Sequence, residues 1–132
     1  MKLRKVSLEF QTLPYSELYP NELRRSFWGK RAEVQKIARE EAYLAGLEQW
    51  KRKKPMELSE VEYHFVLPTR RRRDPDGLIS AAKAWIDGAK DAGIIVDDDI
   101  FHIKRVIITG EYLKNQEKTV ITFTEVKSNG NV

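Results

Sequence analysis

The sequence predicts a single compact α+β domain, in which two main helices pack on a small mixed β-sheet in the order β-α-β-α-β-β. Stretches that alternate apolar and polar residues surround two stretches in which apolar residues recur with the period of an α-helix. The 132 residues suffice for one domain, and 41% hydrophobic with 33% charged residues indicates a modest core under a heavily charged surface. We expect the domain over residues 1–127, followed by a frayed tail at residues 128–132.

The first half of the chain predicts two strands around one long helix. Residues 3–10 alternate as a first strand, and residues 56–67 alternate as a second. Asn21, which follows Pro20, is a suitable N-cap for a helix that extends to about Trp50. The predicted apolar stripe of this helix is Leu23, Phe27, Val34, Ile37, Ala38, Ala42 and Ala45, and the core face of the second strand is Val61, Tyr63, Phe65 and Leu67.

The second half predicts a helix and two further strands. A helix begins near Asp76 and ends at Gly93, which suits the position after a helix C-terminus. Strands are predicted over residues 101–112 and 118–126. The apolar stripe of the helix is Leu78, Ala82, Trp85, Ile86 and Ala89.

The composition excludes several classes of function. The chain has no cysteine, which excludes disulfide scaffolds, thiolate metal sites and cysteine nucleophiles. Two histidines cannot by themselves form a multi-histidine zinc site. No apolar run approaches the roughly 20 residues that cross a bilayer, and residues 1–5 lack the apolar segment of a signal peptide. We therefore expect a soluble, cytoplasmic domain with no membrane partner and no organic cofactor.

The acidic residues are distributed unevenly along the chain. There are 24 Lys and Arg residues against 20 Asp and Glu residues, which gives a net charge of +4. All seven aspartates lie between residues 74 and 99, where only Lys83 and Lys90 offset them. Neighbouring carboxylates raise one another's pKa unless a cation compensates them, and Mg²⁺ prefers such oxygen ligands. The pattern favours a divalent cation site in an otherwise basic protein.

Two carboxylates stand directly before the second predicted helix. Asp74 and Asp76 flank Pro75, which favours extended backbone at Asp74 and the start of a turn, so both can approach one ion. Lys83 lies seven residues after Asp76, and helical side chains point toward the N-terminus, so its ammonium group can approach them. Asp87 lies one turn further along the same face.

Simpler interpretations of these residues stay open. Asp76 serves as a helix N-cap, Lys83 and Asp87 as an i,i+4 ion pair, and the triple aspartate at 97–99 as a solvated turn. His64 and His102 are interpreted as strand residues rather than ligands, with His102 the better candidate because it follows the acidic turn.

The most specific pattern runs from an arginine cluster to a second acidic turn. It reads Arg70-Arg71-Arg72-Arg73-Asp74-Pro75-Asp76-Gly77-Leu78, then Lys83, Asp87-Gly88, Ala92-Gly93 and Val96-Asp97-Asp98-Asp99. This stretch resembles the RusA family of Holliday junction resolvases, with an Arg-rich approach to Asp-x-Asp-Asn-Leu, a helix with Lys and Asp, an Ala-Gly turn and an Asp-Asp pair. The resemblance covers about residues 67–105. The residues Asn21, Arg24, Arg25, Trp28 and Arg31 are similar to the opening helix of phage-borne members.

The resemblance implies a catalytic role for Asp74, Asp76, Asp98 and Lys83, with the three carboxylates holding Mg²⁺ (or Mn²⁺). Asp97, Asp99 and Asp87 are expected to support these ligands. Two positions depart from the family pattern. Gly77 stands where the family usually has Asn, and Lys83 lies three residues beyond the lysine of the best-known arrangement, where this chain has Ser80.

The implied reaction is the hydrolysis of phosphodiesters in four-way DNA junctions. A Mg²⁺ ion can activate water, neutralise charge on the phosphate and stabilise the leaving oxygen. Basic residues near the site would grip the DNA backbone without reading its sequence. Two symmetric nicks require two sites, so the resemblance and symmetry both imply a C2 homodimer on branched DNA. Phe27 and Trp28 could wedge or stack at a branch point, pack in the core or form a dimer contact. Residues 51–54 could extend the DNA-binding track. The expected DNA-binding residues are Arg70, Arg71, Arg72, Arg73, Arg24, Arg25, Lys30 and Arg31.

Two other functions remain open on the sequence. One is a non-catalytic relative that binds junction or duplex DNA, for which Gly77 and the shifted lysine mark lost activity. The other is a basic interaction module in which the aspartates hold a structural cation.

Overall fold

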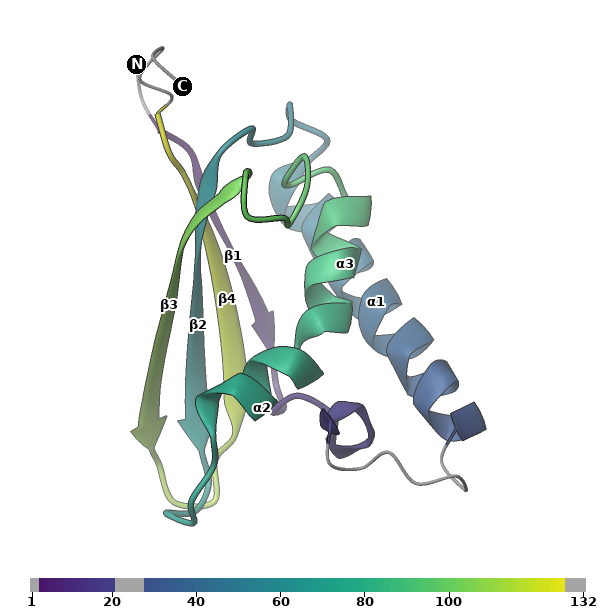
Figure 1. Cartoon of the computed structure of the whole chain (residues 1–132), viewed down its shortest axis with the longest axis vertical. Helices are drawn as coiled ribbons and strands as arrows, with labels where there is room; N and C mark the ends of the chain where they lie inside the picture. The colour runs from purple at the N-terminus through teal and green to yellow at the C-terminus, as the bar shows by residue number, and fades with distance from the viewer. Residues whose placement is uncertain (1–2, 21–27, 128–132) are drawn as a thin grey trace.

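The computed structural model describes residues 3–20 and 28–127, which form a four-stranded sheet covered on one face by helices (Figure 1). The predicted mixed α and β class is confirmed. The predicted N-cap Asn21, the apolar residues Leu23 and Phe27 and the tail at 128–132 lie outside the described residues. Within the described residues, none of the helices combines the length and the apolar content needed to span a bilayer.

The sheet contains β1 (Lys5–Phe10), β2 (Ser59–Leu67), β3 (Ile103–Tyr112) and β4 (Lys118–Glu125) in the spatial order β1-β4-β2-β3. β4 pairs antiparallel with both β1 and β2, whereas β3 pairs parallel with β2. A parallel pair needs a long crossover connection, and the segment between β2 and β3 supplies one that contains two helices. This crossover carries the arginine run and all seven aspartates.

The core lies between the sheet and the helices. Alternate residues of β1, β2 and β4 point to one face, as the period-two pattern predicted for the first two strands. Trp85 is 1% exposed and stacks on Phe10, with ring centroids 4.1 Å apart. The apolar strand residues of this core are Val6, Leu8, Phe10, Val61, Tyr63, Phe65, Ile121 and Phe123.

The long helix α1 (Trp28–Trp50) packs closely against α3 (Lys83–Asp91). A Cβ atom built on Gly88 would lie 2.1 Å from the carbonyl oxygen of Arg39, so only glycine permits this approach. Ala38 and Ala42 are buried in the α1 face, as predicted. Ile37, predicted in the same stripe, is 48% exposed. The prediction was wrong because small residues make the contact between α1 and α3 narrow, and Ile37 lies outside that contact.

The single helix predicted from Asp76 to Gly93 is two helices. α2 (Pro75–Ala81) ends at Ala82, whose amide reaches the carbonyls of both Leu78 and Ile79, and α3 then begins in another direction (Figure 1). Ala82 is completely buried, so the tight turn lies inside the core. Gly93 has φ +82°, which confirms it as the residue that ends the helical segment.

Candidate functional site

The first acidic pair lies where the crossover enters α2. Asp74 has extended backbone (φ −84°, ψ 132°), as the Asp-Pro sequence predicted, and it is the N-cap residue, with Pro75 in the first helical position. The interpretation of Asp76 as the N-cap was wrong, because the helix already begins at Pro75. The Asp74 side chain makes no capping hydrogen bond, and the Asp76 side chain lies in the first turn. Both carboxylates are thus exposed at the start of a helix and face the preceding arginine loop.

A cavity of about 500 Å³ lies beside this pair, and we call it the arginine cavity. It is predominantly polar and combines cationic and anionic side chains, as expected of a site that holds both a phosphate and a metal. Arg72 Nε lies 3.6 Å from Asp74 Oδ1, which is the only ion pair of that carboxylate within residues 3–20 and 28–127. The lining residues are Tyr19, Pro20, Arg71, Arg72, Arg73, Asp74, Asp76, Gly77 and Ser80.

Arg73 is the most constrained of the four arginines. Its Nη1 atom is buried and has no hydrogen-bond partner among the described residues. A buried charged donor without an acceptor costs free energy, which an acceptor that reached it would recover. Burial raises the pKa of the neighbouring Tyr19, which the positive charges of Arg73 and Arg71 partly oppose. Arg70 points elsewhere, with its guanidinium group 4.5 Å from the ring centre of Tyr112.

Lys83 lies in a second acidic group at the start of α3. Its Nζ atom bonds to Asp87 Oδ1, and it lies 2.7 Å from Asp98 Oδ2. Burial disfavours the charged ammonium, but the hydrogen bonds that it donates to Asp87 and Asp98 outweigh this effect, so the pKa of Lys83 is raised. Lys83 is therefore a positive charge at neutral pH in this arrangement, which favours charge neutralisation over the activation of water.

The turn after α3 contains a possible acidic metal-binding group. Asp97, Asp99 and His102 place ligand atoms within 4.8 Å of one another. His102 Nδ1 lies 2.7 Å from Asp99 Oδ1, and this hydrogen bond is the main cause of the lowered pKa of Asp99. Lys90 lies 3.0 Å from Asp97 and lowers the pKa of that carboxyl in the same way. His102 is thus the histidine associated with the acidic turn, whereas His64 lies in β2, 2.7 Å from Thr109 Oγ1.

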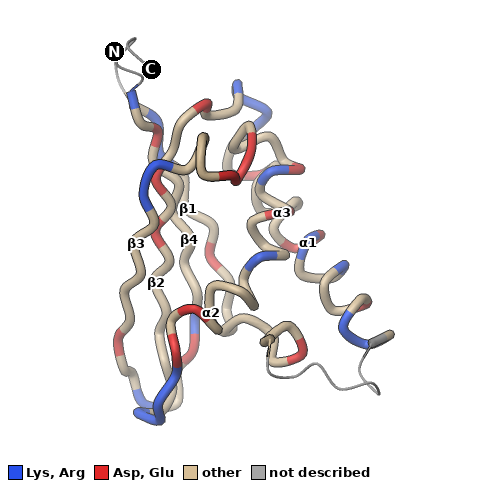
Figure 2. The backbone as a smooth tube through the Cα atoms, viewed as in Figure 1, with Lys and Arg blue, Asp and Glu red and all other residues tan. Residues whose placement is uncertain are grey.

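The structure brings together only some of the predicted site. Asp98 joins Lys83 and Asp87, but Asp74 and Asp76 lie elsewhere, at the start of α2 (Figure 2). In the described part of the chain, no group of neighbouring metal ligands combines these two carboxylates with Asp98. The expectation that Lys83 shares a helix face with Asp76 was wrong, because the helix breaks at Ala82 and α3 takes a new direction.

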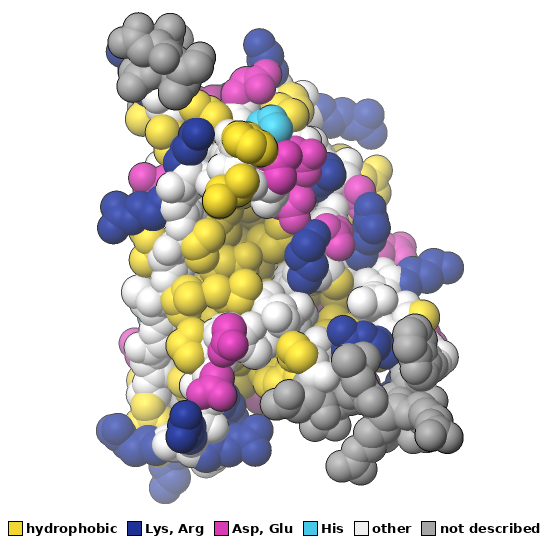
Figure 3. Space-filling view, in the orientation of Figure 1, with side chains coloured by type: hydrophobic (Ala, Val, Ile, Leu, Met, Phe, Trp, Pro, Cys, Tyr) yellow, Lys and Arg dark blue, Asp and Glu magenta, His cyan; other side chains and the backbone are white. Residues whose placement is uncertain are grey.

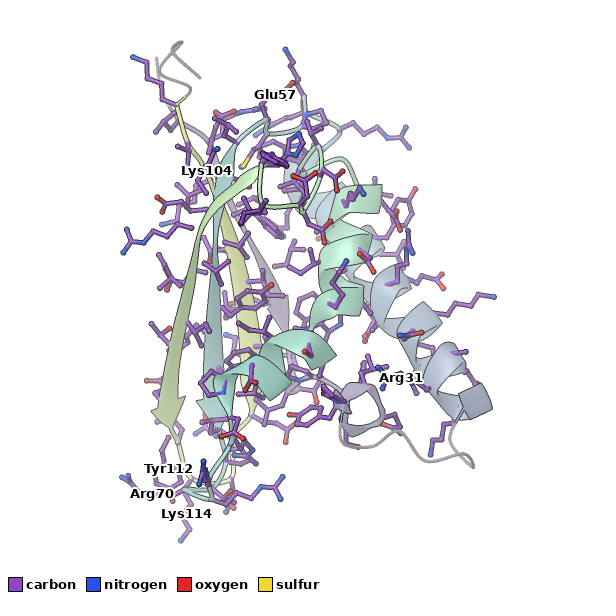
Figure 4. All side chains as sticks on the ribbon, viewed as in Figure 1. Arg31, Glu57, Arg70, Lys104, Tyr112 and Lys114 are labelled. Atoms are coloured by element: carbon purple, nitrogen blue, oxygen red, sulfur yellow. The ribbon has the colours of Figure 1, made fainter. Side chains whose placement is uncertain are left out.

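The predicted DNA-binding residues are spread over two regions. Arg70 lies at the arginine loop, and Arg31 lies in the first turns of α1 on the other side of the molecule (Figure 4). Lys30 Nζ is 3.6 Å from Glu17 Oε2, so part of its charge is already compensated. Arg24 and Arg25 lie outside the described residues, and the basic turn at 51–54 follows the opposite end of α1.

Sequence reasoning missed several residues that line cavities. Tyr19 lines the arginine cavity, and no sequence pattern marked it. Lys36 and Arg39 line a second cavity, and both belong to α1, whose many charged residues hid them from sequence reasoning. Ser80 was noted only as a departure from a motif, yet it lines both cavities.

Comparison with known proteins gives no assignment: no protein-family model matches this chain, and no curated protein matches it.

Proposed function

We propose that this protein is a cytoplasmic, Mg²⁺-dependent endodeoxyribonuclease that cuts four-way DNA junctions by paired, symmetric phosphodiester hydrolysis. One observation supports the proposal more than the others. The arginine cavity places the exposed carboxylates Asp74 and Asp76 beside the guanidinium groups of Arg71, Arg72 and Arg73. A phosphodiester bound to Mg²⁺ needs both kinds of group, because carboxylates hold the cation and a guanidinium binds the phosphate oxygens.

The proposed roles follow from the positions of the side chains. Asp74 and Asp76 would hold Mg²⁺, which Mn²⁺ can replace, and the ion would supply a nucleophilic water at neutral pH. Arg71, Arg72 and Arg73 would bind the DNA backbone at the cut strand. Asp98 would be the third metal ligand, and Lys83 beside it would neutralise charge on the phosphate in the transition state. Asp87, Asp97 and Asp99 would orient these groups.

A second copy of the chain is part of the proposal. In one copy, acidic side chains gather at the start of α2 and again over the turn after α3, with hydrophobic side chains over β2 and β3 between them (Figure 3). Val106 and Ile108 on this face of β3 are 52% and 40% exposed. Exposed apolar patches mark interfaces. A C2 partner on this face would bring the α2 carboxylates of one protomer toward the acidic turn of the other.

The test is cleavage of an end-labelled synthetic four-way junction in the presence of Mg²⁺. We expect paired symmetric nicks, which EDTA and Asp76→Asn abolish while junction binding persists, because Asp76 holds the metal rather than the DNA. The matched control is Glu9→Gln, which removes one exposed carboxylate of β1 on the sheet face away from the helices and should leave the cleavage rate unchanged.

Two results would contradict the proposal. Junction-selective binding without nicks would favour the non-catalytic relative, and Gly77→Asn would then test whether the missing amide is the cause. A protein that neither cuts nor selects junctions, but whose thermal stability rises with Mg²⁺, would favour an interaction module with a structural cation.

A further inference from the structure

A second cavity of about 330 Å³ lies between α1 and α3, and we call it the α1–α3 cavity. Four cationic side chains line it, namely Arg31, Lys36 and Arg39 from α1 and Lys83 from α3. Among the described residues that line it, Asp87 is the one carboxylate, and it is bonded to Lys83. The lining therefore holds more positive than negative side chains, which suits an anion better than a cation.

Three of these cations are held in place by contacts outside the cavity. Arg31 Nη1 donates a hydrogen bond to the carbonyl oxygen of Glu17 at 2.8 Å. Arg39 forms a two-pronged pair with Asp91, at 2.5 and 2.9 Å. Asp98, which does not line the cavity, lies 2.7 Å from Lys83 Nζ. Groups fixed before binding lose little entropy when a ligand arrives, so these contacts prearrange the three cations around the cavity.

Lys36 is the cation that is not compensated. Within the described ranges, 3–20 and 28–127, it takes part in no ion pair, and its side chain is exposed on α1. An ammonium group with three free donors is a suitable contact for one phosphate group. Its exposure also means that it can be replaced with little effect on folding.

The α1–α3 cavity adjoins the arginine cavity. Ser80, near the end of α2, lines both, so the two cavities are neighbours at the junction between α2 and α3. Lys83 lines the α1–α3 cavity and also contacts Asp98 of the proposed catalytic group. A DNA strand whose cut phosphate lies in the arginine cavity would therefore carry a neighbouring phosphate toward α1.

We propose that the α1–α3 cavity binds a second phosphodiester group of the cut strand, with Lys36, Arg31 and Arg39 as its contacts. This inference rests on the proposed function for the source of the phosphate. The contacts supply affinity and position the strand, and they carry no sequence information.

The test measures the salt dependence of DNA binding in the Asp76→Asn background, so that the DNA stays intact. Each phosphate contact contributes about 0.9 to the slope of log Kd against log salt concentration. We expect Lys36→Gln to weaken binding and to lower this slope by about that amount, whereas Lys36→Arg keeps it. The control is Lys5→Gln, an exposed lysine of β1 on the sheet face away from the helices, which should leave the slope unchanged.

A second measurement separates this inference from the proposed function. Inorganic pyrophosphate is titrated into the DNA-free protein and followed by the NMR amide signals of Gln35 and Ser80, which line the cavity. We expect both signals to shift, and the shifts to disappear in Lys36→Gln.

The outcomes are distinct. Junction cleavage with a Lys36→Gln slope equal to that of Lys5→Gln would overturn the phosphate site and leave the nuclease intact. If the protein bound pyrophosphate but no DNA, the proposed nuclease function would be wrong, and DNA would not be the source of the phosphate. The α1–α3 cavity would then be a site for a free polyphosphate.

Discussion

At the scale of single residues, Arg73 shows how a site can cost stability. A buried guanidinium nitrogen without an acceptor destabilises the folded state by about 1–3 kcal/mol. Such a cost is typical of groups kept for binding, because a ligand supplies the missing acceptor. The other three arginines of the run have no buried unpartnered nitrogen among the described residues. We therefore expect Arg73 to gain more than they do from a bound acceptor.

Arg73→Met is therefore expected to separate stability from DNA binding. The free energy of unfolding should stay equal or rise by up to about 1 kcal/mol, since an unsatisfied buried donor is removed. Junction affinity should fall, because the cavity loses a phosphate contact. Urea denaturation and fluorescence anisotropy measure the two quantities. A variant that loses stability would mean that Arg73 has a structural partner instead.

At the scale of elements, the contact between α1 and α3 depends on small residues at the crossing. A Cβ atom at Gly46 would lie 2.6 Å from that of Ala92, and one at Gly88 would meet the α1 backbone. This contact fixes the position of Lys36 and Arg39 relative to Lys83, so it also shapes the α1–α3 cavity.

Gly88→Ala should destabilise the fold by about 3 kcal/mol, because the added methyl group meets a backbone carbonyl that cannot move away. Gly77→Ala is the matched control. Nothing lies within 4 Å of a Cβ atom at Gly77 in α2, so this change should be neutral or stabilise by about 0.5 kcal/mol. Thermal unfolding of both variants measures the difference, and equal melting temperatures would contradict the close crossing.

The helices also show what the sequence can and cannot predict. Three of the strands could be predicted from alternation, since each side chain of a strand faces either core or solvent. β3 does not alternate, because most of its side chains are exposed. The break at Ala82 could not be predicted, because Leu78 and Trp85 fit one continuous helical stripe, and only packing in three dimensions separates α2 from α3. For the same reason the sequence indicated the acidic residues but placed Lys83 with Asp76 rather than with Asp98.

At the scale of the whole molecule, the carboxylates at the start of α2 and those in the turn after α3 lie apart, although the proposed function needs them in one site. β3 is an edge strand, and its residues level with the buried Val61 and Tyr63 of β2 are the exposed Val106 and Ile108. The sheet therefore continues beyond the helices that cover it. Under the proposed function, the partner protomer would cover this face and bring Asp98 to the α2 carboxylates of the other chain.

Mixed dimers test this assembly. Asp76→Asn and Asp98→Asn should each be inactive alone, but a mixture should nick one strand, because one of the two shared sites then contains both native carboxylates. Asp76→Asn mixed with Asp74→Asn is the control, since both changes affect the same group and no site is restored. No recovery in the first mixture would mean that each site is built from a single chain.

The strand order has a consequence for how the chain folds. β4 is the last strand along the sequence, yet it lies between β1 and β2 and pairs with both, with Lys5 opposite Thr124. During synthesis, β1 and β2 therefore cannot pair with β4 until almost the entire domain has left the ribosome. Contacts between such distant residues form slowly, because the intervening chain must first be ordered. Loss of residues 118–125 would remove an interior strand and leave two unconnected parts of a sheet.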